Sequence, residues 1–243
     1  MRRAALAISV FLLSCLAGGA VAARAPDRAR AARAPVVVEL FTAQGCSSCV
    51  VADKVLDGIA SRPGVLALTL AVDYWDYLGW DDTFARPEFS ARQRAYMQKL
   101  ALREVYTPQM VVDGKVQAAG ADRQKVEALI REAQRSRAPA PAMRMMRRGR
   151  LQIGTGRAPR GGADVWLVRY SPGVQEVAVK RGENRGQVLS QRNVVRELVK
   201  VGRWAGKSRI YALPPASGDD QALKTAILVQ AADGGRIVGI LLR

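Results

Sequence analysis

The sequence predicts an α/β domain followed by a smaller, mostly β domain. In the first half of the chain, apolar strand-like runs alternate with helical patterns. In the second half, several short alternating runs are separated by Gly and Pro, which is typical of a β sandwich. The stretch 136–142, rich in Ala and Pro, predicts a linker between the two. We therefore expect domains at 36–135 and 143–243.

The start of the chain has the pattern of an export signal, assigned to residues 1–23. Arg2 and Arg3 give it a positive beginning, and an apolar core of about 13 residues follows. Ala20-Val21-Ala22 then matches a small-x-small cleavage site. The sequence therefore predicts a periplasmic or secreted protein. A lipoprotein anchored through Cys15 is the less favoured alternative.

Composition narrows the classes of function. The chain contains no histidine, which excludes mechanisms that need imidazole as a base or as a metal ligand. The net charge is +17, and residues 138–243 carry 19 Lys and Arg against 7 Asp and Glu. These basic residues are scattered, so the sequence favours an anionic membrane surface or an acidic partner over nucleic acid. Residues 24–35, rich in Ala, Arg and Pro, predict a disordered segment.

The chain is organised around a strand that leads into a pair of cysteines. The apolar run at 36–41 predicts a buried strand, and Cys46-Ser47-Ser48-Cys49 opens a helical pattern that continues to Ile59. Free N–H groups and the helix dipole would stabilise a thiolate at Cys46. We expect Cys46 to be the exposed, attacking thiol and Cys49 to resolve the mixed disulfide. The alternative is an inert structural disulfide.

The remaining elements of the first domain follow from further apolar runs and capping residues. The continuous run Val65–Val72 predicts a strand covered on both faces. Ser90 and Asp122 are expected to cap two helices. Asp113-Gly114 predicts a hairpin between the last two strands. The order strand, helix, strand, helix, strand, strand, helix is that of the thioredoxin fold.

The second domain is predicted from alternating runs. They lie at 164–170, 174–179, 210–213, 226–229 and 237–242. The segment Asn193–Lys200 fits either a helical or a strand period, and its surroundings favour a strand. We therefore expect a small sandwich-like domain.

The segment Asp73–Phe89 reads as an insertion beside the cysteines. It concentrates aromatic and acidic residues, and Tyr74, Trp75, Asp76 and Trp80 are the candidates for a substrate-binding rim. The alternative is that these aromatic side chains fill the core of the insertion itself.

Glu39 is a carboxylate in the middle of an otherwise apolar strand. If its side chain points inward, burial would raise its pKa and allow it to take a proton from Cys49. The alternative is a glutamate at the edge of the strand that faces solvent or pairs with a nearby base.

Three methionines open the possibility of a copper site. Met143, Met145 and Met146, together with the thiols of Cys46 and Cys49, are soft ligands suited to Cu(I). Methionines in such a place more often pack on a sheet. The sequence therefore predicts no bound metal and no cofactor.

Several stretches of the chain resemble a secreted bacterial family with a thioredoxin-like domain and no assigned function. The main blocks are VELFTAQGCSSC at 38–49, VDYWDYLGW at 72–80 and YTPQMVV at 106–112. Stretches 181–184 and 193–196 also resemble C-terminal blocks of that family, so the resemblance covers nearly all of the chain after the export signal. One departure is Val50, where the family usually has proline.

The resemblance implies a thioredoxin-like domain followed by a β-rich one. In thioredoxin-like proteins a Thr-Pro pair at the place of Thr107-Pro108 has a cis peptide bond and faces the two cysteines. We therefore assign Thr107 and Pro108 to the same site as Cys46 and Cys49. The resemblance supplies no substrate.

Together, these observations predict an exported thiol–disulfide oxidoreductase. It would act on protein thiols and disulfides through Cys46 and Cys49, and a redox partner protein would restore the pair. The rival hypothesis is a non-catalytic binding module that holds a partner, or Cu(I), through the same cysteines.

Overall fold

The computed structural model describes residues 34–136, 139–216 and 223–243. The predicted export signal, with Cys15, lies outside the described residues, and so does nearly all of the segment 24–35. Within the described ranges, no helix is long and apolar enough to cross a membrane.

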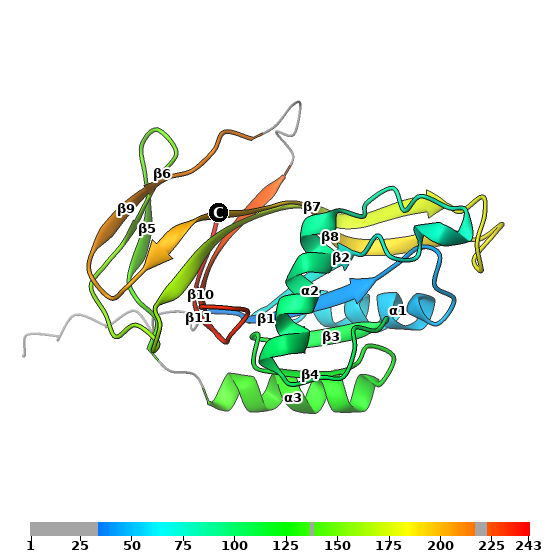
Figure 1. Ribbon diagram of the computed structural model, residues 1–243, viewed down its shortest axis with the longest axis horizontal. Helices are drawn as coiled ribbons and strands as arrows, with labels where there is room; N and C mark the ends of the chain where they lie inside the picture. Colours follow the sequence, from blue (N-terminus) through cyan, green and yellow to red (C-terminus); the bar gives the residue numbers. More distant parts are fainter. Residues whose placement is uncertain (1–33, 137–138, 217–222) are drawn as a thin grey trace, which may run out of the picture. The chain divides into compact units, whose positions relative to one another are not determined.

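The described residues form a mixed α/β structure with one large and one small sheet (Figure 1). The large sheet has eight strands in the order β11-β10-β7-β8-β2-β1-β3-β4, and the small sheet has the order β5-β6-β9. The strands are β1 (Val36–Thr42), β2 (Val65–Ala71), β3 (Gln109–Val112), β4 (Val116–Ala119), β5 (Met143–Met146), β6 (Arg150–Ile153), β7 (Ala163–Ala178), β8 (Val188–Trp204), β9 (Arg209–Ala212), β10 (Lys224–Ala231) and β11 (Ile237–Leu242). The helices are α1 (Cys49–Ala60), α2 (Pro87–Lys99) and α3 (Arg123–Arg135), with a short 3₁₀ helix at Asp76–Leu78.

Strand β1 is buried along its whole length and lies between two neighbours in the large sheet. It pairs in parallel with β2 and antiparallel with β3. Helices α1 and α3 pack with Val38 and Leu40 on one face. On the other face, the ring of Phe41 makes an edge-to-face contact with Tyr96 of α2, with centroids 6.0 Å apart. Cover on both faces explains why β1 and β2 are mostly apolar, and it confirms the double cover that the sequence predicts for the run at 65–72.

The ends of two helices follow local chemistry. The prediction that Asp122 caps α3 is confirmed, because its side chain accepts a hydrogen bond from the backbone N–H of Lys125 at 3.0 Å. The prediction that Ser90 caps a helix is wrong. Helix α2 begins at Pro87, a residue whose fixed φ suits the first helical position. The Ser90 hydroxyl instead donates to the carboxylate of Asp73 at 2.5 Å.

The second half of the chain differs most from expectation. Two predicted strands at 164–170 and 174–179 are a single strand, β7, with an irregular register between Ser171 and Val174. The segment 193–200 is a strand, as favoured, and lies inside β8.

The strands of the second half do not form a separate sandwich. Strand β8 lies beside β2, with Thr69 opposite Val194, so the large sheet contains strands from both sides of the predicted linker. Ala34–Arg243 forms one compact unit. Within the ranges that the structure describes, β5, β6 and β9 make a second sheet. The physical reason is that β2 would otherwise be an exposed apolar edge, and β8 covers it.

Asn193 fixes the junction between β8 and β2. Its side-chain N–H donates to the carbonyl of Ala67 in β2 at 3.0 Å, and its oxygen accepts from the backbone N–H of Gly173 at 3.2 Å. Its φ of 51° lies in the left-handed region, which asparagine tolerates better than most residues.

We expect Asn193→Ala to lower the free energy of unfolding by about 1–3 kcal/mol, because two partly buried polar groups lose their partner and alanine is strained at this φ. Urea titration measures the change. Asn193→Gly is the matched control, since it loses the side-chain bonds without the strain, and it should unfold at a higher urea concentration than the alanine variant. Equal stability of the alanine variant and the parent would contradict the assigned role.

Candidate functional site

Cys46 and Cys49 form a disulfide where the β1–α1 turn enters the helix, with Cα atoms 5.4 Å apart. Ser48 precedes the first residue of α1, and Cys49 is that residue. Ser47 and Ser48 are exposed, whereas each cysteine is only 1 % exposed. The expectation that Cys46 is the exposed thiol is therefore wrong for this disulfide state, because neighbouring segments cover both sulfurs.

One part of that cover comes from the Thr-Pro pair and the insertion. The Thr107–Pro108 peptide bond is cis, as expected, and the hydroxyl of Thr107 donates to Cys46 Sγ at 3.4 Å. The indole N–H of Trp75 donates to the same hydroxyl oxygen at 2.8 Å. Trp75 also packs against the hydrophobic cluster that contains both cysteines. The Thr-Pro pair, the insertion and the disulfide therefore meet at one place.

The other candidate rim residues are bonded within the protein. Trp80 donates its indole N–H to Gln44 Oε1 at 2.9 Å, and Tyr74 donates its hydroxyl to a glutamine of α2. Asp82, missed by the sequence reasoning, accepts from the Gln44 backbone N–H at 2.7 Å, and its own N–H reaches Asp76 at 3.1 Å. Burial raises the pKa of Asp82 to about 6. These side chains therefore bond to the cysteine turn and to α2 and do not form a separate core of the insertion, and their role in substrate binding stays a prediction.

A second part of the cover is the tip of the β7–β8 hairpin, residues 179–187, which we call the hairpin tip. The backbone N–H of Ser47 donates to Glu183 Oε2 at 2.9 Å. The buried amide of Asn184 donates to the carbonyls of Gln44 at 2.9 Å and of Cys46 at 3.0 Å. Sequence reasoning did not place these residues in the site, because a polar, Gly-containing turn between strands is typical of a solvated loop.

Glu39 points inward, but it is paired. Its carboxylate accepts from Arg92 at 2.5 and 3.2 Å and from the hydroxyl of Tyr96. Arg92 also donates to Gln230 Oε1 at 3.0 Å, and its guanidinium lies 5.1 Å from the centre of the Tyr96 ring. The structure thus matches the alternative in which Glu39 pairs with a base, which leaves no free carboxylate at this position to serve Cys49.

A different buried carboxyl lies one helical turn after Cys49. Asp53 faces the same side of α1 and is 5 % exposed, and its Oδ1 accepts from Thr42 at 3.3 Å. Burial raises its pKa to about 7, so it exchanges a proton near neutral pH. Beside it lies the buried side-chain amide of Gln191. The sequence signal that marks Asp53 is its place on the apolar face of α1.

The methionines are separated from the cysteines. Met143 and Met145 pack in a hydrophobic cluster with Leu151 and Trp204, whereas the cysteines belong to a cluster around β1 and β2. Among the described residues, no group of three Cys, Asp or Glu side chains is placed to hold a metal ion. The structure therefore does not bring the five proposed copper ligands together.

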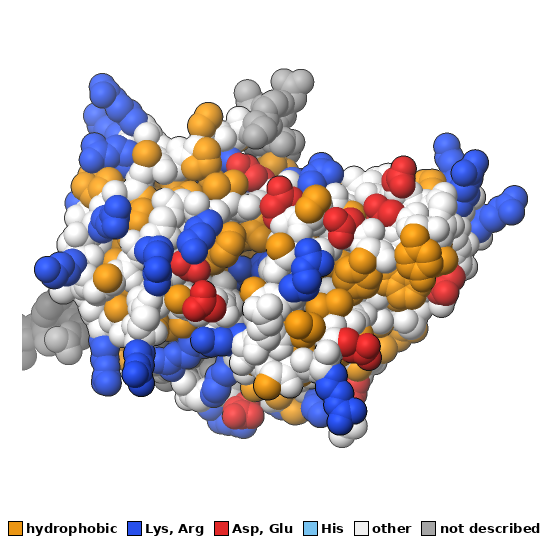
Figure 2. Space-filling view, viewed as in Figure 1, with side chains coloured by type: hydrophobic (Ala, Val, Ile, Leu, Met, Phe, Trp, Pro, Cys, Tyr) orange, Lys and Arg blue, Asp and Glu red, His pale blue; other side chains and the backbone are white. Residues whose placement is uncertain are grey.

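Charged side chains are spread over the surface. On the face in Figure 2, Lys and Arg side chains occur across the whole width, with Asp and Glu side chains among them. Attraction to an anionic membrane surface stays a prediction.

Comparison with known proteins identifies a family that matches most of the chain. The model of the family described as "Protein of unknown function (DUF1223)" matches residues 37–230. No curated protein matches the chain.

Two solved structures are similar. The first is protein AGR_C_4864 from Agrobacterium tumefaciens, with 32 % identity over 86 % of this chain and 94 % of that one, and a TM-score of 0.71. The second is HBP35 of Porphyromonas gingivalis, with 12 % identity over 86 % and 74 % of the two chains and a TM-score of 0.57, which is a likeness of fold.

The Glu39–Arg92 pair gives a prediction about stability. Arg92→Met leaves the Glu39 carboxylate buried without its cation, so we expect it to lower the free energy of unfolding by about 3–5 kcal/mol. The double variant Glu39→Met/Arg92→Met should recover most of that loss, because two apolar side chains replace the pair. Urea unfolding measures both. A double variant as unstable as the single one would contradict the pairing.

Asp53 gives a prediction about pH. Its folded pKa is about 7 and its ordinary value is 3.8, so between about pH 4 and 7 the folded protein keeps a proton that the unfolded chain has lost. Stability therefore falls as the pH rises through this window, by up to about 4 kcal/mol at 1.4 kcal/mol per pKa unit. In Asp53→Asn the contribution of Asp53 should disappear, and a smaller fall should remain from groups such as Asp82, whose pKa is also raised by burial. Chemical unfolding at several pH values tests it, with exposed Glu132→Gln as the control that keeps the parent's pH dependence.

Proposed function

The chain belongs to the family described as "Protein of unknown function (DUF1223)", and we propose that it is an exported thiol–disulfide oxidoreductase acting on protein thiols and disulfides. The observation that carries the proposal is the disulfide at the start of α1 with Thr107 bonded to Cys46. The succession β1-α1-β2-α2-β3-β4-α3 supports a thioredoxin-like arrangement of the first half. A dithiol at a helix N-terminus, facing a Thr-Pro turn, suits thiol–disulfide exchange.

The proposed reaction is two successive exchanges. In the reduced pair, the Cys46 thiolate attacks a substrate disulfide, forms a mixed disulfide and releases one substrate thiolate. The Cys49 thiolate then attacks Cys46 Sγ, which re-forms the Cys46–Cys49 disulfide and releases the second substrate thiol. Two electrons pass to the substrate, and a dithiol partner protein returns the pair to its reduced form. Running in reverse, the same steps oxidise a substrate dithiol.

We assign to Asp53 the role of taking the proton from the Cys49 thiol and returning it. Its carboxyl lies one helical turn away on the same buried face, and a pKa of about 7 lets it accept a proton and give it up near neutral pH. This assignment replaces the role that the sequence suggested for Glu39.

Access of a substrate to Cys46 distinguishes this proposal from the rival hypothesis of a non-catalytic module. Because each cysteine is 1 % exposed, a protein substrate reaches Cys46 only when part of the cover, such as Trp75, moves aside. A cover that never moves would favour a non-catalytic scaffold with a buried structural disulfide. The exposed residues Ser47, Ser48 and Tyr77 mark where a substrate would first meet the site.

Turnover and trapping test the proposal. The protein without residues 1–23 should catalyse the reduction of insulin by dithiothreitol, and Cys46→Ser should abolish this activity. Cys49→Ser should accumulate a mixed disulfide with the substrate, because the second exchange is missing. Mass spectrometry of the trapped product identifies the protein substrate. A pair that is reduced readily but gives no turnover would favour the binding module, and a pair that resists reduction in the folded state would favour the inert disulfide.

A further inference from the structure

The hairpin tip holds the cysteine turn by its backbone. Glu183 takes the N–H of Ser47 at 2.9 Å, and Asn184 donates to the carbonyls of Gln44 and Cys46. These three bonds reach across more than 130 positions in sequence. They end on the backbone of Gln44, Cys46 and Ser47, so the tip contacts the turn that carries the proposed attacking thiol.

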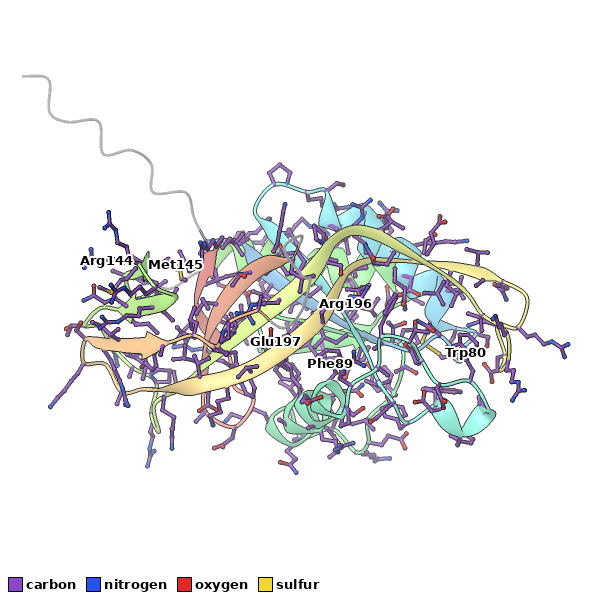
Figure 3. All side chains as sticks on the ribbon, turned by 90° about the horizontal axis from the view of Figure 1, so that it is seen from above. Trp80, Phe89, Arg144, Met145, Arg196 and Glu197 are labelled. Atoms are coloured by element: carbon purple, nitrogen blue, oxygen red, sulfur yellow. A yellow bond between two sulfur atoms is a disulfide. The ribbon has the colours of Figure 1, made fainter. Side chains whose placement is uncertain are left out.

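The approach of the two backbones is close. Gly182 has φ of 79°, and a Cβ on it would lie 3.6 Å from Gly45 Cα and 3.8 Å from Trp80 Cβ. Figure 3 shows Trp80 near the distal end of the β7–β8 hairpin. Pairing of the strands continues to Ala178 and Val188, so the tip is carried by a regular ladder. The paired strands β7 and β8 therefore hold Glu183 next to Ser47.

The charge of Glu183 lies at the backbone amide of the residue that follows Cys46. Its side chain is exposed, and the hydrogen bond from Ser47 holds the pKa of its carboxyl below the usual value, so it is ionised at neutral pH. The N–H of Ser47 lies just before α1, where free N–H groups and the helix dipole otherwise favour a negative sulfur. The exposed cations Arg181 and Arg185 flank Glu183 in the hairpin tip, but the carboxylate is the charge that is bonded to the Ser47 N–H. It adds a like charge next to Cys46, which disfavours the thiolate.

We propose that Glu183 is a positioning residue that acts through the Ser47 amide to hold back ionisation of Cys46, and so makes the disulfide harder to reduce wherever the thiolate is populated. The redox consequence rests on the proposed function, whereas the effect on the thiol does not. The residue touches no reacting atom.

The thiol itself provides the first test. In a Cys49→Ser background, Cys46 is the single free thiol of the chain without residues 1–23, and ultraviolet absorbance of the thiolate reads its titration even if the sulfur is covered. Adding Glu183→Gln should lower the pKa of Cys46 by about half a unit, since one screened like charge is removed. Glu176→Gln, an exposed carboxylate on the shaft of the same hairpin, is the matched control and should change nothing.

The disulfide equilibrium provides the second test. With both cysteines present, Glu183→Gln should shift the equilibrium with glutathione about threefold toward the dithiol at pH 9, which is about 15 mV at 29.6 mV per tenfold. At pH 6, where the thiol is protonated, the shift should vanish. Asn184→Ala removes two bonds of the tip without changing charge, so any effect it has should be alike at both pH values.

Two results would overturn the inference. One is an unchanged pKa of Cys46 in Glu183→Gln. The other is a shift of the glutathione equilibrium in Glu183→Gln that is the same at pH 6 and pH 9, which is the behaviour expected of Asn184→Ala. Neither depends on turnover. A protein that fails to reduce insulin but shows the Cys46 shift would refute the proposed function and leave this role of Glu183 standing.

Discussion

The ion pair between Glu39 and Arg92 is the interaction on which the rest of the structure depends. Both side chains are almost completely buried, and a buried charge is tolerated only when a partner and further hydrogen bonds satisfy it. Tyr96 and Gln230 complete that set, so β1, α2 and β10 must meet at one point. Arg92 also lies over the ring of Trp166 in β7, with its guanidinium carbon 5.4 Å from the ring centre.

This pairing explains why the chain does not divide where its composition changes. Gln230 lies beyond the Ala- and Pro-rich stretch, yet it bonds to Arg92 from the first half. Strand β8 likewise crosses the expected boundary to lie beside β2. An Ala- and Pro-rich stretch has few large apolar residues to bury. Its composition does not indicate which strands on either side of it pair with each other. A linker in sequence is therefore compatible with a single sheet.

The parts that could be predicted were those fixed by local chemistry. The apolar runs of β1 and β2, the Asp113-Gly114 turn and the Asp122 cap depend on neighbours in sequence, and each lies where the pattern placed it. The cysteine pair and its Thr-Pro partner were also predictable, because their order along the chain is informative. Strand partners were not, since a period of two marks a strand without naming its neighbour.

The same limit applies to the candidate site. Glu39 is recognisable in the sequence because a charge interrupts an apolar strand, but no local pattern indicates that Arg92 would reach it. Asp53 was overlooked because an acidic residue in a helix is usually solvated, although its spacing from Cys49 puts it on the buried face. Glu183 and Asn184 act only through the long hairpin that carries them. A long-range contact of this kind leaves no trace in local pattern.

The late position of the hairpin tip has a consequence for the order of events during synthesis. A chain made from its N-terminus presents Cys46 and Cys49 long before Glu183 and Asn184 exist, so for that interval the cysteine turn lacks one part of its cover. The pair is therefore more open to other molecules before the hairpin forms than in the finished protein. The completed hairpin then adds its contacts to whichever redox state the pair has reached.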